Sequence, residues 1–407
     1  MKEKFEKYAE LLLKRCLNLK EGEPLLIEAP IENYEFIRLL NKKALEMGVS
    51  DIHIEWYDDE LKHDTLKYLT EEEIENHPFW NKKIFDEYAS KNAAFLMLNA
   101  SDPDIMNDID PKKVTKAGYT SIKTRPIYKR KQNIYEVSWC IAATSTLGFS
   151  KKVFPKSDDP VTDLWNQIFE ICFINTENPI EEWEKQVIKS ENRSNILNKY
   201  KFKMLHYTNS LGTDLKIGLT DKTIWCGAGE KNLDGRKILV NLPTFEVFTS
   251  PDKNKTNGVV YSSKPLVYNG TLIENIRLEF KDGKVVNFDA SKGKDVLEGI
   301  LKADENSCML GEAALVDYNS PISNSNIIFY TTLYDENAAC HLALGNGFKT
   351  ALENGVNLSL EELDELGLNN SVVHVDFMIG TKDLCITGID SYGNEKEIFK
   401  DGNFVLE

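Results

Sequence analysis

The sequence lacks long hydrophobic runs. Its apolar segments are short, and none approaches the roughly 20 consecutive apolar residues that a membrane-spanning helix needs. At the N-terminus, residues 1–15 interleave charged and apolar side chains, so the uninterrupted apolar centre of a signal peptide is also missing. We therefore predict a cytoplasmic protein with no membrane partner.

Cysteine is scarce and scattered. The chain has seven cysteines, and no two of them form a CxxC pair. An odd number without paired spacing gives no support to a disulfide framework or a zinc knuckle. Each cysteine lies in an apolar context, so we interpret them as reduced, mostly buried thiols of a cytoplasmic protein.

Phosphate-binding motifs are missing too. Neither a GxGxxG after the first predicted strand nor a Walker motif occurs. Positive charge is in the minority, since 49 Lys and Arg stand against 65 Asp and Glu for a net charge of −16. Such a surface repels nucleic acid and anionic membranes, so we expect neither as a partner. It tolerates cationic ligands, including metal ions and the ammonium end of a peptide.

The 407 residues, 42% of them hydrophobic, are enough for substantial cores and favour two domains. In the first half, apolar runs that read as buried strands alternate with segments at helical spacing. We predict strands at 24–30, 51–56, 93–101 and 137–144, and helices at 4–19 and 34–47. This alternation is typical of an α/β domain with a parallel, doubly wound sheet.

A polar helical stretch at 157–200 follows. We interpret its second part, residues 181–200, as a helix that connects the domains. The prediction is therefore an N-terminal α/β domain at 1–195 and an α+β, β-rich C-terminal domain at 196–407.

The second domain has a different sequence pattern. From about Phe202 the sequence breaks into short strands with Gly, Asn and Asp turns, and KDGK at 281–284 indicates a hairpin. Helices are predicted at 294–303 and within 336–354. The domain is expected to be largely antiparallel.

Two carboxylates of this domain lie in apolar surroundings. Glu246 stands in NLPTFEVFTSPD, just past a predicted strand, and Glu312 stands in CMLGEAALV. A carboxylate among apolar side chains is costly to bury unless a cation pairs with it. Glu246 could instead face solvent from a strand, and Glu312 could begin a helix near Gly311.

The segment YDENAACHLALGNG predicts Glu336 just before a helix and His341 on that helix. Its small residues would let a ligand approach closely. Two residues five positions apart do not lie on the same face of a helix. Glu336 would therefore reach in from the N-terminal edge, while His341 projects from the second turn. His341 could instead be a hydrogen-bonded core histidine.

His374 and Asp376 lie two apart in the apolar run VVHVDFMIGT. The two-residue period of a strand puts both on one face, which favours a shared cation. A simple His–Asp pair or a solvent-facing strand would have the same spacing. Across the candidate residues the acids outnumber the imidazoles about two to one, a balance that suits a two-metal site with zinc, cobalt or manganese.

Five segments of the second half occur in a fixed order: GTDLKIGL, NLPTFEVFTSPD, LGEAALV, YDENAACHLALG and HVDFMIGT. The first half adds NASDPDIMNDIDPKK and SWCIAAT. Over nearly the whole chain, these segments resemble the aminopeptidase T / aminopeptidase S family of metalloaminopeptidases, also called the thermophilic aminopeptidases.

The resemblance implies an enzyme that removes N-terminal residues from peptides with a free N-terminus, using a metal-activated water. It implies an N-terminal α/β domain, a C-terminal catalytic domain and a homodimer that encloses the active sites. It also implies two divalent metal ions per subunit, with Glu312 as the expected bridging carboxylate. The implied ligands are Glu246, Glu312, Glu336, His341, His374 and Asp376.

One position departs from the family pattern. Where the family has a Tyr after the HLALG motif, this sequence reads GNGF and carries Phe348. Loss of one hydroxyl that supports a tetrahedral intermediate can cost roughly 10²–10³ in turnover, and Tyr330 and Tyr334 are candidate replacements. One alternative is therefore a catalytically weak metal- or peptide-binding relative. Another, a nucleotide-binding α/β protein with structural acids, is disfavoured by the missing phosphate loop.

Overall fold

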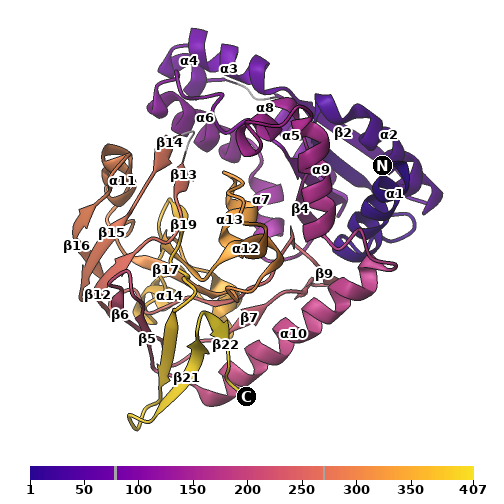
Figure 1. The fold of residues 1–407 in the computed structure, drawn as a ribbon. Coiled ribbons are helices and arrows are strands. Elements are labelled where there is room, and N and C mark those ends of the chain that lie inside the picture. The colour runs from indigo at the N-terminus through magenta and orange to yellow at the C-terminus, as the bar shows by residue number, and fades with distance from the viewer. Residues whose placement is uncertain (78–79, 269–270) are drawn as a thin grey trace. The chain divides into compact units, whose positions relative to one another are not determined.

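A computed structural model describes residues 1–77, 80–268 and 271–407. Figure 1 shows the helices and strands along the chain, coloured by residue number. Within the described residues, no helix combines the length and the hydropathy that crossing a bilayer requires.

The chain divides into two compact units that are not simply consecutive. The first unit comprises Met1–Lys185 and Gly229–Thr244, and the second comprises Gln186–Ala228 and Phe245–Glu407. The segment Gly229–Thr244 therefore interrupts the second unit, and the chain re-enters that unit immediately before Glu246.

A five-stranded parallel sheet forms the centre of the first unit, in the order β10-β4-β3-β1-β2. Four of its strands coincide closely with the predicted ones, which confirms the parallel sheet. The fifth comes from the segment Gly229–Thr244. The strands are β1 (Leu25–Pro30), β2 (Ile52–Tyr57), β3 (Ala94–Asn99), β4 (Trp139–Ala143) and β10 (Asn241–Leu242).

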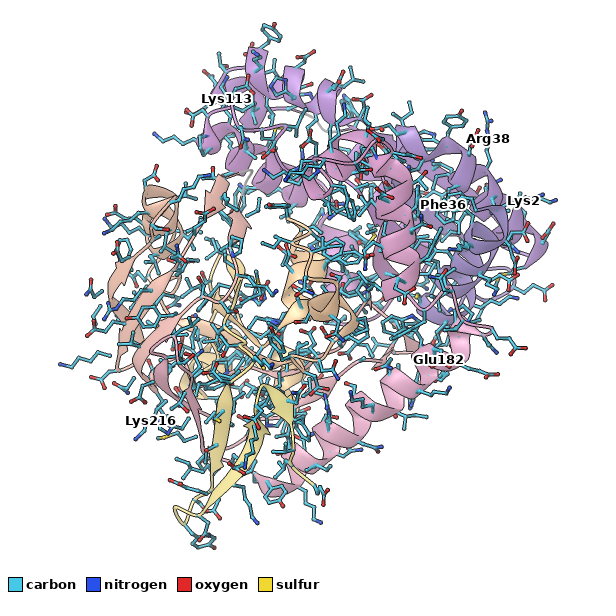
Figure 2. The ribbon with its side chains drawn as sticks, viewed as in Figure 1. Lys2, Phe36, Arg38, Lys113, Glu182 and Lys216 are labelled. Carbon is cyan, nitrogen blue, oxygen red and sulfur yellow. The ribbon has the colours of Figure 1, made fainter. Side chains whose placement is uncertain are left out.

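Helices alternate with these strands. Figure 2 shows the amphipathic character of α2, where Phe36 is buried and Arg38 is exposed. The Phe36 ring packs against Phe5, Tyr8 and Trp165 from helices α1 and α9. The helices and the small ribbon of this unit are α1 (Lys2–Glu10), η1 (Leu11–Cys16), η2 (Ile31–Asn33), α2 (Tyr34–Glu46), α3 (Asp59–Tyr68), α4 (Glu71–Glu75), α5 (Trp80–Ser90), α6 (Pro111–Lys123), α7 (Pro126–Asn133), α8 (Leu147–Val153), α9 (Pro160–Ile171), β8 (Glu230–Lys231) and β9 (Lys237–Ile238).

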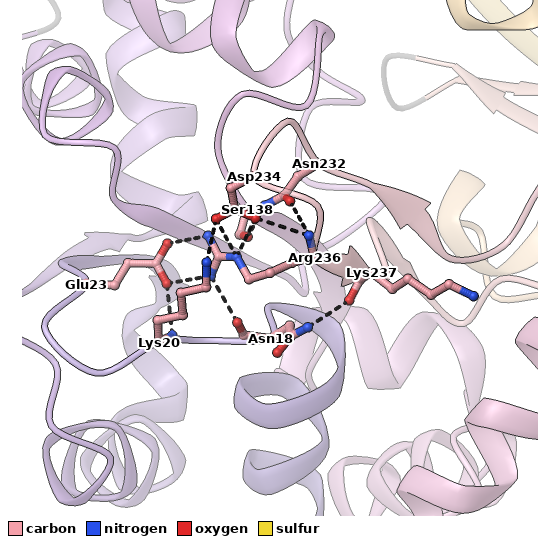
Figure 3. A network of polar contacts seen from close by, with 8 residues as sticks. All are labelled: Asn18, Lys20, Glu23, Ser138, Asn232, Asp234, Arg236 and Lys237. Carbon is pink, nitrogen blue, oxygen red and sulfur yellow. Dashed lines mark hydrogen bonds and ion pairs between the residues drawn. The ribbon is translucent and has the colours of Figure 1, made fainter.

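A charge network centred on the partly buried Arg236 fastens Gly229–Thr244 to the rest of the first unit (Figure 3). The Arg236 guanidinium donates to both carboxylate oxygens of Glu23, each at 2.8 Å, and to the Asn18 carbonyl at 2.9 Å. Asp234 adds an ion pair with Lys20 at 2.9 Å. Because a guanidinium paired with both oxygens of one carboxylate is held in one geometry, this network fixes the segment from which the chain continues to Glu246.

The second unit begins within helix α10 (Pro179–Tyr200), which spans the predicted connector. Its larger sheet is antiparallel, in the order β16-β15-β12-β6-β5-β20-β21-β22. The predicted KDGK hairpin joins β15 to β16, with Asp282 and Gly283 at positive φ. The strands are β5 (Met204–Thr208), β6 (Asp214–Gly218), β12 (Thr256–Tyr261), β15 (Arg277–Lys281), β16 (Lys284–Asp289), β20 (Cys385–Ile389), β21 (Glu395–Lys400) and β22 (Asn403–Phe404).

A second antiparallel sheet, in the order β19-β18-β17-β11-β7, shares one hydrophobic core with the larger sheet. This confirms the β-rich α+β character predicted for the second half. Its strands are β7 (Cys226–Gly227), β11 (Val247–Thr249), β17 (Leu310–Leu315), β18 (His341–Gly345) and β19 (His374–Met378). The remaining elements are β13 (Leu266–Tyr268), β14 (Thr271–Ile273), α11 (Lys294–Leu301), α12 (Pro321–Ser325), α13 (Thr332–Asp335), η3 (Glu336–Ala338), η4 (Lys349–Ala351), η5 (Gly355–Asn357) and α14 (Leu360–Glu365).

The predicted helix around His341 is wrong. Helix α13 ends at Asp335, a single 3-10 turn covers Glu336–Ala338, and His341 opens strand β18. All five residues of β18 are buried between β17 and β19. A central strand of this kind has a continuous apolar sequence, which periodicity does not separate from a buried helix.

Candidate metal centre

The register of the smaller sheet gathers the candidate residues on one face. Glu312 of β17 lies opposite Ala343 of β18, and Ala343 lies opposite Asp376 of β19. Residues directly opposite each other in an antiparallel sheet point to the same face, as do residues two apart on one strand. His341 and His374 therefore share that face, and the methyl group of Ala343 leaves the space between the acids open.

Glu246 joins the same face from the next strand. Phe248 of β11 lies opposite Ala314, which in turn lies opposite His341. Glu246 is two residues before Phe248, so its carboxylate points in the same direction. The expectation that Glu312 could begin a helix is wrong, because Glu312 lies within β17.

Both histidines are held by their Nδ1 atoms. His341 Nδ1 lies 3.2 Å from the Ala339 carbonyl oxygen, and His374 Nδ1 lies 2.7 Å from that of Asn346. A hydrogen bond from Nδ1 to a carbonyl oxygen leaves Nε2 as the free ligand atom, which is the usual arrangement of metal-binding histidines. His341 Nε2 lies 3.2 Å from Glu246 Oε2.

His374 Nε2 lies between two carboxylates, 3.1 Å from Glu312 Oε2 and 3.3 Å from Asp376 Oδ1. The Phe348 ring packs edge-on against the His374 ring, with 5.0 Å between centroids. Phe348 therefore lies at the centre itself, where it restricts how far the imidazole can turn.

Two groups of potential ligands form in this way, and they share one residue. The first is Glu246, Glu312 and His341, and the second is Glu312, His374 and Asp376. Within each group the ligand atoms lie within 4.8 Å of one another. Glu246 Oε2 and Asp376 Oδ1 are buried, and each faces an imidazole Nε2, at 3.2 Å and 3.3 Å respectively. Buried carboxylate oxygens of this kind fit a divalent cation with oxygen and imidazole ligands.

The pKa values express the excess of buried negative charge. Burial raises the pKa of Glu312 to about 7, although the hydrogen bond from His374 opposes this. Burial and the charges of Asp376 and Glu246 raise the pKa of Glu336 well above its ordinary range. Burial alone would lower the pKa of His374, but Asp376 and Glu312 outweigh it and raise that pKa well above its ordinary range. The cluster therefore stabilises positive charge.

Glu336 lies beside the two groups and belongs to neither of them. It is 9% exposed, and its carboxylate interacts electrostatically with four of the other candidates. Asn337, the next residue, links this carboxylate to the opposite side of the centre. Its Nδ2 donates to Glu336 Oε1 at 3.4 Å, and its Oδ1 accepts from the Phe245 backbone N–H at 2.7 Å, directly before Glu246.

Sequence reasoning missed Asn337, although it stands inside the YDEN segment. We expect Asn337→Ala to weaken metal binding by about 10- to 100-fold, as loss of a ligand-orienting hydrogen bond does elsewhere. Titration of chelator-stripped protein with zinc, cobalt or manganese measures this change.

Asn198→Ala is the matched control for this prediction. Asn198 also accepts from one backbone N–H and donates to one carbonyl, both of Trp225, at 2.8 and 3.0 Å. Its loss should lower the melting temperature without a comparable loss of metal affinity. Equal metal affinities of wild type and Asn337→Ala would contradict the orienting role.

A small cavity adjoins Asp376. It is lined by Pro265, Leu266, Val267, Tyr330, Thr331, Thr332, Asp335, Asp376 and Met378. Asp335 was also missed by sequence reasoning. Burial raises the pKa of its carboxyl to about 7, and it accepts a hydrogen bond from the Phe329 backbone N–H at 2.9 Å. Its position next to Glu336 in an acidic pair was the available signal.

Comparison with known proteins identifies the family. A family model described as thermophilic metalloprotease (M29) matches residues 1–404. The chain belongs to this family. The M29 assignment confirms the resemblance to the aminopeptidase T / aminopeptidase S family, and it makes the chain a metal-dependent peptide hydrolase.

Curated M29 relatives match over their full length. Aminopeptidase AmpS of Bacillus subtilis is 39% identical over 99% of this chain and 99% of its own. Aminopeptidase T of Thermus thermophilus is 34% identical over 100% of this chain and 99% of its own length. In these comparisons the catalytically weak alternative is not favoured, and a nucleotide-binding protein has no support.

The solved structure of wild-type AmpT from Thermus thermophilus matches with a TM-score of 0.93 at 34% identity, covering 100% of both chains. A 2,5-dihydroxypyridine dioxygenase from Pseudomonas putida matches with a TM-score of 0.53 at 9% identity. The second likeness concerns the fold alone, so the M29 fold is not restricted to peptidases.

Proposed function

We propose that this M29 chain is an aminopeptidase that removes N-terminal residues from peptides at a two-metal site. The observation that supports a pair of ions most directly is that Glu312 belongs to both potential ligand groups. Two ions that share a carboxylate lie close enough to act on one substrate bond. The full-length relatives that are named as aminopeptidases support the reaction class.

One ion would be held by Glu246, Glu312 and His341, and the other by Glu312, His374 and Asp376, with Glu312 bridging. Glu336, at the edge of both groups, remains a predicted ligand. The donor set suits zinc, cobalt or manganese. Bound divalent ions supply Lewis acidity and make water nucleophilic near neutral pH.

The chain's own residues bind and orient the substrate and handle the proton. The acidic cluster and Asp335 in the adjoining cavity attract the free α-ammonium group of a peptide, which restricts cleavage to the first residue. A carboxylate of the cluster accepts the proton of the attacking water and donates it to the leaving amine. Phe348 offers no hydroxyl at the centre, so positioning there depends on the other residues.

We also propose a cytoplasmic homodimer. The cytoplasmic location is supported by the seven scattered cysteines, no two of which form a CxxC pair. The homodimer is supported by the family resemblance alone, and light scattering during size-exclusion chromatography measures it directly.

Hydrolysis of aminoacyl-p-nitroanilides tests the proposal. Protein is stripped with a chelator and reloaded with zinc, cobalt or manganese, and an N-acetylated substrate serves as control. We expect release of p-nitroaniline only with metal and only from substrates with a free amine, because the acidic site selects the ammonium group.

Other outcomes separate the alternatives. Tight metal uptake without turnover, together with turnover gained by Phe348→Tyr, would favour the catalytically weak relative. Cleavage of the N-acetylated substrate would contradict recognition of the free amine. Failure to take up any of the three metals would contradict the assigned ligands.

A further inference from the structure

Residues of the segment 262–266 line two cavities: the small one beside Asp376 and a second one. This cavity has a volume of about 180 Å³ and shares Pro265 with the small cavity beside Asp376. Its lining consists of Ser262, Ser263, Lys264, Pro265, Glu274 and Asn275.

The segment is fixed to the strand that carries Asp376. The Ser263 backbone N–H donates to the Met378 carbonyl at 2.8 Å, and Met378 follows Asp376 by two residues on β19. The side-chain oxygen of Ser263 is buried and has no hydrogen-bond partner. An unpaired hydroxyl therefore belongs to a residue of the cavity lining, on a backbone that is fixed to the strand of Asp376.

Lys264 brings positive charge to this cavity. Burial lowers the pKa of its ammonium group, while the charge of Asp335 opposes that change. Among the described residues Lys264 forms no ion pair, and Asp335 is the carboxylate whose charge acts on it from a longer distance. A partly buried ammonium group without a partner is costly unless an anion approaches it.

We propose that this second cavity binds the C-terminal carboxylate of the substrate, with Lys264 as its charged partner and the Ser263 hydroxyl as a donor. The enzyme then prefers short peptides whose free carboxylate reaches Lys264 while their ammonium end lies at the acidic cluster. This inference rests on the proposed aminopeptidase function. It adds a substrate class, namely small peptides with both ends free.

The test compares Leu-Gly-Gly with its C-terminal amide. Wild type should hydrolyse the free acid with a higher kcat/KM, because a hydrogen-bonded ion pair to a charged group is worth about 10- to 100-fold. Lys264→Met should remove this preference mainly through KM, and Lys264→Arg should largely retain it. Lys284→Met, which removes an exposed lysine of β16, controls for net charge and should keep the preference.

The outcomes distinguish this inference from the function on which it rests. Equal kcat/KM for acid and amide in wild type, or an unchanged ratio in Lys264→Met, would overturn the carboxylate site while leaving the aminopeptidase in place. Absence of hydrolysis of both peptides with every metal would instead overturn the proposed function. Hydrolysis of the C-terminal amide by Lys264→Met at the wild-type rate would exclude misfolding as the cause of its lost preference.

Discussion

Glu312→Gln is expected to abolish turnover and to remove both metal ions. Glu312 is the residue shared by the two potential ligand groups, and a neutral amide of the same shape is a poor ligand for either ion. Loss of several kcal/mol of Lewis-acid stabilisation corresponds to a fall in kcat of at least roughly 10³-fold. Elemental analysis of the reloaded protein gives the metal stoichiometry, and p-nitroanilide hydrolysis gives kcat.

The same variant should make the metal-free protein more stable. Glu312 is 4% exposed and lies near the carboxylates of Glu246 and Asp376, so removal of its charge relieves repulsion between buried acids. With metal added the order should reverse, because ligands that bind only the folded state stabilise it. Thermal unfolding of wild type and Glu312→Gln, with and without zinc, measures the order of their melting temperatures in each condition. A metal-free Glu312→Gln that melts below metal-free wild type would indicate a structural role for this carboxylate.

Strands and helices whose apolar residues follow a simple local pattern could be predicted from the sequence. The inner strands β1 and β3 of the parallel sheet are largely buried on both faces, so their apolar runs stand out between amphipathic helices. His374 and Asp376 could be paired in advance because the period of two is a local property of a strand. The KDGK turn likewise carries its own backbone preference at Gly283.

Structural features that depend on contacts between residues far apart in the sequence could not be predicted from local patterns. The return of Gly229–Thr244 to the first unit depends on the ion pair of Arg236 with Glu23, more than 200 residues away. His341 was placed on a helix because its strand is buried on all sides and has no alternation. The links made by Asn337 and the cavity at Lys264 appear only once separate strands are brought together.

The convergence of the candidate ligands has a comparable explanation. Glu246, Glu312 and Asp376 stand out in the sequence because each is surrounded by apolar neighbours, which is a local signal. The sharing of Glu312 by two groups depends on the register that aligns Glu312, Ala343 and Asp376 across three strands. Register is set by the whole sheet. The types of the ligand residues could therefore be predicted from the sequence, whereas their division into two groups required the structure.

Asp376→Ala is expected to abolish turnover while one metal ion remains bound. Asp376 belongs only to the group with Glu312 and His374, so the group of Glu246, Glu312 and His341 keeps its ligands. The fold should be retained, because the variant removes one of several buried acids and His374 Nε2 keeps its contact with Glu312 Oε2 at 3.1 Å. We expect one ion per subunit where wild type binds two, and a fall in kcat of at least roughly 10³-fold.

The matched control is Asp383→Ala, an exposed acid in the same unit that bonds to Thr381 and Ser210. It should bind two ions and retain full turnover. An active Asp376→Ala enzyme would contradict the ligand assignment, and loss of both ions would contradict the division into two groups. Together with Glu312→Gln, which removes both ions, the single-ion result for Asp376→Ala would identify Glu312 as the bridge, since only a shared ligand affects both groups at once.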